Sequence, residues 1–213
     1  MSLYDTGKRL MDIIGAVFGI ILFSPLLVGG ALWVKIVSPS GPILADTPER
    51  IGKNRKHFKF LKFRSMIPDA HNYLLKNPKL YKKYKENNYK IDPKEDPRLL
   101  PGARFMRKFS IDEMPQFFNV LLGDMSIVGP RAYYLFEIKD QVEKNPEAKK
   151  YIDDVMSVKP GITGVWQVSG RSKIVFADRV RLDAEYAKRR SLLYDLLIVL
   201  KTPFAVLRGE GAY

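Results

Sequence analysis

The chain has 213 residues, enough for one domain with a hydrophobic core, and its 46% hydrophobic and 28% charged residues exclude a disordered polymer. It has no cysteine and only two histidines, His57 and His71, which excludes disulfides, thiol catalysis and metal sites built from cysteine or histidine; a bound metal would be an oxygen-bound ion such as Mg²⁺. A formal net charge of +13 predicts an anionic partner: nucleic acid, acidic lipid or a phosphorylated substrate.

The first predicted element is an apolar segment without charges at residues 13–34, close to the ~20 residues that a helix needs to cross a bilayer. A single spanning helix is one interpretation, and no small-residue cleavage site follows that would mark a removable signal peptide. Ser24 and Pro25 interrupt the segment at its centre, because a proline removes a backbone hydrogen bond and clashes with the preceding turn. Gly29 and Gly30 weaken its second half. A helix-break-helix that enters and leaves by one face fits this pattern equally well.

Basic residues stand on both sides of the apolar segment, with Lys8 and Arg9 before it and Lys35 after it. Since cytoplasmic flanks of membrane segments are enriched in Lys and Arg, both ends are expected on the cytoplasmic side. We therefore predict that residues 1–38 form a re-entrant helix-break-helix, and that residues 39–213 form a domain on the cytoplasmic face.

The next predicted element is a basic stretch at residues 50–64, which contains seven Lys or Arg and no acidic residue. Its aromatic residues alternate with lysines as they would in a strand. This composition is typical of a juxtamembrane patch that faces anionic lipid. It also suits single-stranded nucleic acid, although nothing else in the chain resembles a nucleic-acid-binding module.

The remaining elements follow in chain order. We expect a polar, lysine-rich helical insertion at about 69–90 interrupted at Pro78, a loop at 92–105, an apolar helix from 117, a charged helix at 137–154, a glycine-rich loop at 159–171, a helix at 176–190 and an apolar helix at about 191–207. The glycines of the 159–171 loop would let its backbone approach a ligand closely. The apolar helix at 191–207 either packs in the core or lies at a membrane interface.

Two adjacent carboxylates, Asp112 and Glu113, stand in "SIDEMPQ" at 110–116. Adjacent acids repel each other and lose solvation when they are buried. Ser110 with Glu113 three residues later has the capping-box pattern, so a helix start is the expected meaning of the four residues by themselves. The alternative is that the pair is a reactive centre.

Several stretches resemble the bacterial sugar transferases that move a phosphosugar onto a polyprenyl phosphate, the monotopic phosphoglycosyltransferases. They are "KFRSM" (62–66), "DPR" (96–98), "MRKFSIDEMPQFFNVLLGDMSIVGPR" (106–131), "PGITGVWQVSGR" (160–171) and "LDAEY" (182–186), with Ser24–Pro25 in the apolar segment. Ala132 departs from the family, which usually has proline there, and "DPRLLP" departs from its usual loop. The resemblance implies an α/β fold, mostly helical with a small sheet, in a minimal catalytic form, monotopic on the cytoplasmic face of the bacterial inner membrane.

The same resemblance implies a reaction and a site. A sugar 1-phosphate would pass from a UDP-sugar to Asp112, with release of UMP, and then to polyprenyl (undecaprenyl) phosphate, while Asp112 and Glu113 hold Mg²⁺. The substrate-binding candidates are Lys62, Arg64, Arg107, Pro130, Arg131, Gln167, Arg171 and Asp183. Arginine suits phosphate because its paired donors are fixed in one plane. Simpler roles stay open: lipid or solvent contact for Lys62, Arg64 and Arg107, a surface acid for Asp183, and packing for Trp166.

The leading interpretation is therefore an enzyme for the first membrane step of surface glycan synthesis, whether O-antigen, capsule, exopolysaccharide or glycoprotein. Its expected partners are a UDP-sugar, polyprenyl phosphate and inner-membrane lipid, with no nucleic acid. The alternative is a membrane-tethered protein that binds anionic lipid or nucleic acid through residues 50–64. The sequence leaves open the sugar, the glycan and the oligomeric state, a homodimer included.

Overall fold

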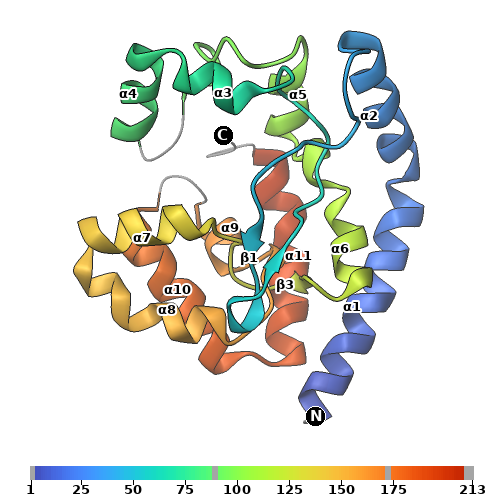
Figure 1. The fold of residues 1–213 in the computed structure, drawn as a ribbon. Helices are drawn as coiled ribbons and strands as arrows, with labels where there is room; N and C mark the ends of the chain where they lie inside the picture. The colour runs from blue at the N-terminus through green and yellow to red at the C-terminus, as the bar shows by residue number, and fades with distance from the viewer. Residues whose placement is uncertain (1–2, 88–90, 171–173, 209–213) are drawn as a thin grey trace.

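The computed structural model describes residues 3–87, 91–170 and 174–208, which are mostly helical with two small two-stranded sheets, an α/β arrangement as expected (Figure 1). The helices are α1 (Leu3–Leu22), α2 (Ser24–Val37), α3 (Ala70–Leu75), α4 (Pro78–Glu86), α5 (Ala103–Lys108), α6 (Gln116–Leu122), α7 (Leu135–Lys144), α8 (Lys149–Met156), α9 (Val165–Ser169), α10 (Phe176–Arg189) and α11 (Leu192–Arg208). The strands are β1 (Arg50–Ile51), β2 (His57–Phe58), β3 (Ser126–Val128) and β4 (Gly161–Thr163), and the 3₁₀ turns are η1 (Lys53–Arg55), η2 (Ile111–Glu113) and η3 (Pro146–Ala148).

Helices α1 and α2 form an arm along one edge of the molecule, bent by 63° between Leu22 and Ser24 (Figure 1). The Ser24 hydroxyl donates a hydrogen bond to the Ile21 carbonyl (2.8 Å), and Pro25 lies in the first turn of α2, where a missing N–H leaves no bond unmade. The predicted helix-break-helix is therefore present. The described part of the chain has no single helix long and apolar enough to cross a membrane, and only the bent pair, taken together, meets that test of length and composition.

The basic residues in the first half of α1 form hydrogen bonds and ion pairs with other parts of the protein. The Arg9 guanidinium donates to the carbonyls of Val120 and Leu121 (2.6 and 2.8 Å) in the last turn of α6, where carbonyls lack the N–H partners of a continuing α-helix. The Lys8 ammonium lies 3.0 Å from Asp12 and 3.2 Å from Asp195, which is fully buried in α11. Both residues thus hold α1 against the rest of the fold, so their positive charge is a weaker indicator of membrane topology than we expected.

The two sheets join segments that are far apart in the sequence. Strands β1 and β2 pair antiparallel with Arg50 opposite Phe58, while β3 and β4 pair parallel with Ser126 opposite Gly161. A Cβ atom on Gly129 would overlap the backbone at Lys159, Pro160 and Gly161, and one on Gly161 or Gly164 would overlap the backbone of Gly129. These glycines are therefore required where one chain segment packs on another.

The basic stretch at 50–64 is not a continuous surface patch. Arg50 and Arg64 are 7% and 4% exposed, and three phenylalanines of the stretch are buried: Phe58, Phe60 and Phe63. Its named strands are only two residues long each, β1 (Arg50–Ile51) and β2 (His57–Phe58), so no continuous strand runs through the stretch. The interpretation of this stretch as a site for lipid or nucleic acid therefore loses much of its support.

The charged helix expected at 137–154 is wrong. The chain forms α7, breaks at Asn145 and resumes through η3 as α8, because Pro146 has no N–H to continue the α7 ladder. Helices α7, α8 and α10 enclose a hydrophobic cluster that includes Ile138, Ile152 and Val180. The helix expected at 176–190 corresponds to α10, and the lysine-rich insertion corresponds to α3 and α4.

Candidate active site

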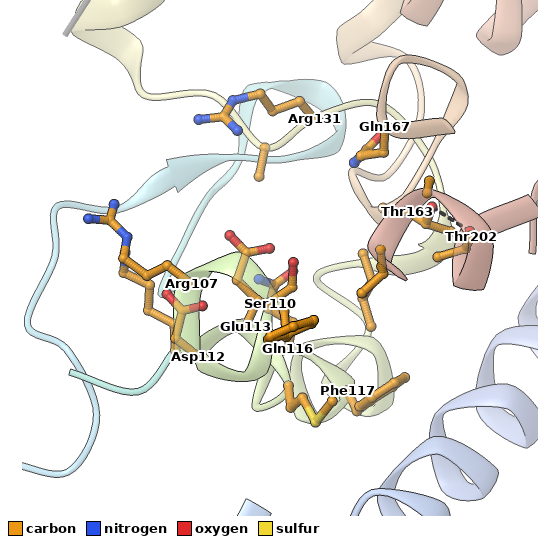
Figure 2. Close-up of a pocket in the computed structure, with 18 of the residues that line it drawn as sticks. Arg107, Ser110, Asp112, Glu113, Gln116, Phe117, Arg131, Thr163, Gln167 and Thr202 are labelled. Carbon is orange, nitrogen blue, oxygen red and sulfur yellow. Dashed lines mark hydrogen bonds between the residues drawn. The ribbon is translucent and has the colours of Figure 1, made fainter. Parts of the chain in front are cut away.

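A cavity of about 470 Å³ lies between the turn that carries the two adjacent carboxylates and the C-terminal half of α11 (Figure 2). Its lining residues come from the α1–α2 bend, β1, the segment that follows β2, α5, η2, α6, the segment that follows β3, β4, α9 and α11. The volume is in the range of small-molecule sites. Two motifs that are distant in the sequence, 106–117 and 161–167, meet at this one cavity.

The turn at residues 110–114 directs both carboxylates into the cavity (Figure 2). Ser110 has a left-handed backbone (φ 56°) and makes no side-chain capping bond, so the predicted capping box is absent. A positive φ is uncommon for a residue with a Cβ, and such strain tends to occur at functional sites. The backbone carbonyl of Asp112 accepts a hydrogen bond from the Phe63 N–H (2.8 Å), which ties this turn to the segment that carries Lys62.

The Asp112 carboxyl group is buried, at 4% exposure. Burial and the adjacent Glu113 charge raise its pKa to about 6, while Lys62 and Arg107 act to lower it. At neutral pH most of it is therefore ionised. A carboxylate that is largely desolvated and faced by two cations is a suitable nucleophile for a phosphorus centre.

Asn119 of α6 holds the segment that carries Lys62. Its amide accepts from the Leu61 N–H (2.9 Å) and donates to the Lys59 carbonyl (2.8 Å). Arg107, at the end of α5, lines the cavity beside Asp112 (Figure 2). Both predicted cations thus line the same cavity as the nucleophile candidate.

Arg131 and Gln167 line the side of the cavity opposite Asp112 (Figure 2). The Arg131 guanidinium lies 5.4 Å from the Trp166 ring centroid, and its Nε atom has no hydrogen-bond partner. The backbone N–H of Arg131 donates to the carboxyl group of Asp183 (3.2 Å), which also accepts from the Tyr133 hydroxyl (3.1 Å). Asp183 is fully buried beneath this wall and does not line the cavity, so its position suits support of Arg131 better than substrate contact.

One part of the cavity is apolar and reaches the bend of the helical arm. Phe23, at the bend, stacks on Phe117 of α6 with ring centroids 6.1 Å apart, and both line the cavity. The C-terminal part of α11 supplies further apolar lining through Pro203, Ala205, Val206 and Leu207. Thr202 of α11 is hydrogen-bonded to Thr163 of β4 (2.8 Å), which fixes this part of the helix to the sheet (Figure 2).

The structure brings together six of the predicted site residues: Lys62, Arg107, Asp112, Glu113, Arg131 and Gln167. Arg64 lies elsewhere, because its guanidinium donates to Ser38 Oγ, the Ser38 carbonyl and the Pro42 carbonyl (2.7–2.8 Å) and closes the loop after α2. Pro130 is fully buried and only its carbonyl is engaged, by the Gly161 N–H (2.8 Å). Arg171 lies outside the described residues.

Sequence analysis missed several cavity residues, among them Arg50, Gln116 and Thr202. Gln116 was detectable, because it stands in the same "SIDEMPQ" motif as the carboxylates. Arg50 and Thr202 carry no such signal, since one belongs to a generally basic stretch and the other to a generally apolar one.

The residues present fit a magnesium ion that is shared with a substrate. No group of three or more acidic or histidine side chains that could hold a metal forms among the described residues, so they build no all-protein cage. Mg²⁺ is commonly bound by one or two carboxylates, with waters and substrate phosphates completing its shell. Asp112 and Glu113 supply two carboxylates in one cavity, which matches that mode.

Comparison with known proteins gives consistent matches along the chain. An undecaprenyl-phosphate galactose phosphotransferase of Salmonella typhimurium is 40% identical over 212 residues, which cover 97% of this chain and 41% of the relative. An exopolysaccharide production protein ExoY of Sinorhizobium fredii is 37% identical over 210 residues, with 97% and 88% covered. A UDP-glucose:undecaprenyl-phosphate glucose-1-phosphate transferase of Escherichia coli is 36% identical over 229 residues, with 100% and 44% covered.

The chain thus spans less than half the length of the Salmonella and Escherichia relatives, and most of the length of ExoY. A family model described as bacterial sugar transferase matches residues 3–209, which include the bent helical arm and every part of the cavity. The chain therefore belongs to the bacterial sugar transferase family.

Proposed function

We propose that the protein transfers a sugar 1-phosphate from a UDP-sugar to undecaprenyl phosphate, as the first membrane step in the synthesis of a surface glycan. The observation that carries the proposal is the cavity, in which the buried Asp112 and the adjacent, partly buried Glu113 are faced by cations while the adjoining lining is apolar. Such a cavity suits a phosphorylated donor together with a phosphorylated lipid. The printed names of the Salmonella and Escherichia relatives support this substrate class.

The proposed reaction has two steps, each with one bond formed and one broken. In the first, an Asp112 oxygen attacks the sugar-linked phosphorus of the donor. The bond from that phosphorus to the bridging oxygen breaks, and UMP leaves with the electron pair. In the second, a phosphate oxygen of the lipid attacks the same phosphorus, and the Asp112 carboxylate is regenerated. A carboxylate that forms a covalent intermediate divides one difficult transfer into two easier ones.

Charge repulsion is the main barrier to these steps, because the nucleophile and both substrates are anionic. The positive charges of Lys62 and Arg107 stabilise the ionised form of Asp112, and Arg131 lines the opposite side of the cavity. Fixed cations in a partly dehydrated site oppose this repulsion more strongly than water does. Mg²⁺, when bound by Asp112, Glu113 and the donor phosphates, supplies further neutralisation of charge.

The proposal also places the protein at a membrane. Apolar side chains are exposed along three helices: Leu10, Ile14, Phe18 and Ile21 on α1, Val28, Leu32 and Ile36 on α2, and Leu193, Leu196, Leu200, Phe204 and Leu207 on α11. Exposed apolar surface of this extent is typical of a membrane-facing surface. We propose a monotopic arrangement at the cytoplasmic face, with the α1–α2 arm re-entrant, so that the apolar part of the cavity meets the lipid chain.

The test is UMP release from a panel of UDP-sugars, by purified protein with Mg²⁺ and undecaprenyl phosphate. We expect release with at least one sugar and its loss in Asp112→Asn, because an amide is a far weaker nucleophile at phosphorus. Asp153→Asn, at an 88% exposed side chain, is the control and should keep full activity. No release with any sugar, or undiminished release by Asp112→Asn, would contradict the proposed function.

A further inference from the structure

Arg50 is a buried cation of the cavity whose hydrogen bonds are incomplete. It is 7% exposed and lines the cavity, with its guanidinium 3.3 Å from the centroid of the Tyr134 ring. One Nη atom donates to the Ala132 carbonyl (3.1 Å) and lies 3.9 Å from Glu137. Its Nε atom is buried and has no partner. A buried donor without a partner is costly, so its presence at a cavity wall indicates a ligand.

The charges around Arg50 are also unbalanced. Burial alone would raise the pKa of Glu137, but Arg131, Arg179 and Arg50 together hold it below its usual value. Besides Glu137, the carboxylate of Glu113 also stabilises the charged forms of Arg50 and Arg131. The Asp183 carboxyl group also interacts with Arg131 and Arg179, but burial raises its pKa to about 7, so it carries only part of a charge at neutral pH. Three buried or half-buried guanidinium groups thus meet two carboxylates and one partly protonated carboxyl group, and the Nε atoms of all three lack a partner. An anionic ligand would restore the balance.

The other unpartnered atoms of the cavity wall fit an oxygen-rich ligand. Gln116 Nε2 and Trp166 Nε1 are buried donors without acceptors, as are the Nε atoms of Arg50 and Arg131. Gln167 Oε1 is a single acceptor without a donor. Four donors and one acceptor match a ligand with many oxygen acceptors and at least one hydroxyl or N–H group, as a nucleotide has.

The cations of the cavity divide into two groups about the carboxylate pair. The positive charges of Lys62 and Arg107 act to lower the pKa of Asp112. The negative charge of Glu113 instead acts to raise the pKa of Arg50 and of Arg131. In a phosphoryl transfer the leaving oxygen lies roughly in line with the attacking one, on the far side of the phosphorus. Arg131 lies across the cavity from Asp112 (Figure 2). Arg50 is next to Arg131, because it binds the carbonyl of the following residue, Ala132.

We propose that Arg50, together with Arg131, binds the phosphate that leaves with the nucleotide of the donor. This inference rests on the proposed function and adds a residue to it. When the bond to the bridging oxygen breaks, the electron pair stays on the nucleotide phosphate, and the fixed guanidinium groups stabilise that charge. Arginine stays protonated throughout, so no proton moves in this contact.

The test compares UMP binding and donor kinetics in Arg50→Met and Arg50→Lys with those of the native chain. Loss of a charged hydrogen bond should weaken UMP binding and raise the KM for the donor about 10- to 100-fold in Arg50→Met. The KM for undecaprenyl phosphate should change less than twofold, because Lys62 and Arg107 are intact. Arg50→Lys should fall between the two, since it keeps the charge and lacks the planar pair of donors.

Arg179→Met is the matched control. Arg179 is equally buried and pairs with the same Glu137 (3.4 Å), but it does not line the cavity. We expect it to lower thermal stability and to change UMP affinity much less than Arg50→Met. Equal losses of UMP affinity in both Met variants would mean that Arg50 acts through Glu137, and would overturn the inference.

Two results separate this inference from the proposed function. A native chain that neither binds UMP nor releases it from any UDP-sugar contradicts the proposed function. A native chain that binds UMP, with an unchanged affinity in folded Arg50→Lys and Arg50→Met, overturns the role of Arg50 alone. If Arg50→Met does not fold, an unchanged UMP affinity in Arg50→Lys gives the same negative result.

Discussion

Asp183 shows how a buried acid can matter without touching a substrate. Its side chain is fully buried in α10 and accepts hydrogen bonds from the Arg131 N–H and the Tyr133 hydroxyl. Its other oxygen has no partner. Burial raises its pKa to about 7, because these two hydrogen bonds only partly replace the lost hydration. The carboxyl group is therefore partly protonated at neutral pH.

This pKa predicts a pH-dependent stability difference between the native chain and Asp183→Asn. The folded state holds the Asp183 proton between about pH 4, where the unfolded chain releases it, and about pH 7. The free energy of unfolding contributed by Asp183 therefore falls with rising pH in that window, by about 1.4 kcal/mol for each pH step of one. Asparagine does not titrate, so Asp183→Asn does not lose stability in this way. The free energy of unfolding of the variant, relative to that of the native chain, should therefore rise as the pH rises across the window.

Urea unfolding of the purified protein between pH 4 and pH 8 measures this difference. Asp178→Asn is the matched control, an exchange in the same helix at a 53% exposed side chain. A difference between Asp183→Asn and the native chain that does not vary with pH would show that the raised pKa is wrong.

Individual residues were predicted well where they belong to a specific motif, and poorly where only their type was known. Asp112, Glu113 and Arg131 stand in a long motif and line one cavity. Arg50 and Arg64 stand in the same basic stretch, yet one lines the cavity and the other closes the loop after α2. Sequence composition treats them alike, because their difference arises from the partners that each meets after folding.

At the scale of elements, the two glycines of α2 have different environments. A Cβ on Gly30 would lie 2.6 Å from the Phe63 ring, whereas a Cβ on Gly29 would have no atom within 4 Å. Phe63 is 4% exposed, and its N–H binds the Asp112 carbonyl. Gly30 thus lets α2 approach the segment that supports the active-site turn.

Alanine at each of these positions should have opposite effects. Gly29→Ala should stabilise the protein by about 0.5–1 kcal/mol, since alanine favours the helix and meets nothing. Gly30→Ala should destabilise it by about 1–3 kcal/mol through overpacking, and should reduce UMP release because Phe63 must move. Thermal unfolding and the UMP assay on both variants check this. Stabilisation by both substitutions would show that α2 does not pack tightly on Phe63.

Helices were easier to predict than strands. The break at Ser24–Pro25 and the helix at 176–190 could be read from proline and from local patterns. The strands contain only two or three residues each and depend on partners that are distant in sequence, such as Ser126 with Gly161. The break between α7 and α8 was missed, although Pro146 signals it.

For the whole molecule, the proposed membrane arrangement predicts that both ends of the α1–α2 arm are on the same side. Leu3 is 96% exposed and Ser40 is exposed, and the chain has no native cysteine, so single-cysteine variants need no other change. A membrane-impermeant maleimide should label neither Leu3→Cys nor Ser40→Cys in intact cells, and both in opened membranes. The cysteine-free native chain is the control. Opposite labelling of the two variants would mean that the arm spans the membrane.

The sequence by itself determined the family, the position of the break in the apolar segment and the carboxylate pair, because each depends on residues that are neighbours in the chain. Only the tertiary structure decided which cations face that pair, that Asp183 is buried beneath Arg131, and that Arg50 completes the opposite wall. The physical reason is that burial and charge pairing depend on contacts between distant segments. A residue type therefore specifies what a side chain can do, and the fold specifies which partners it meets.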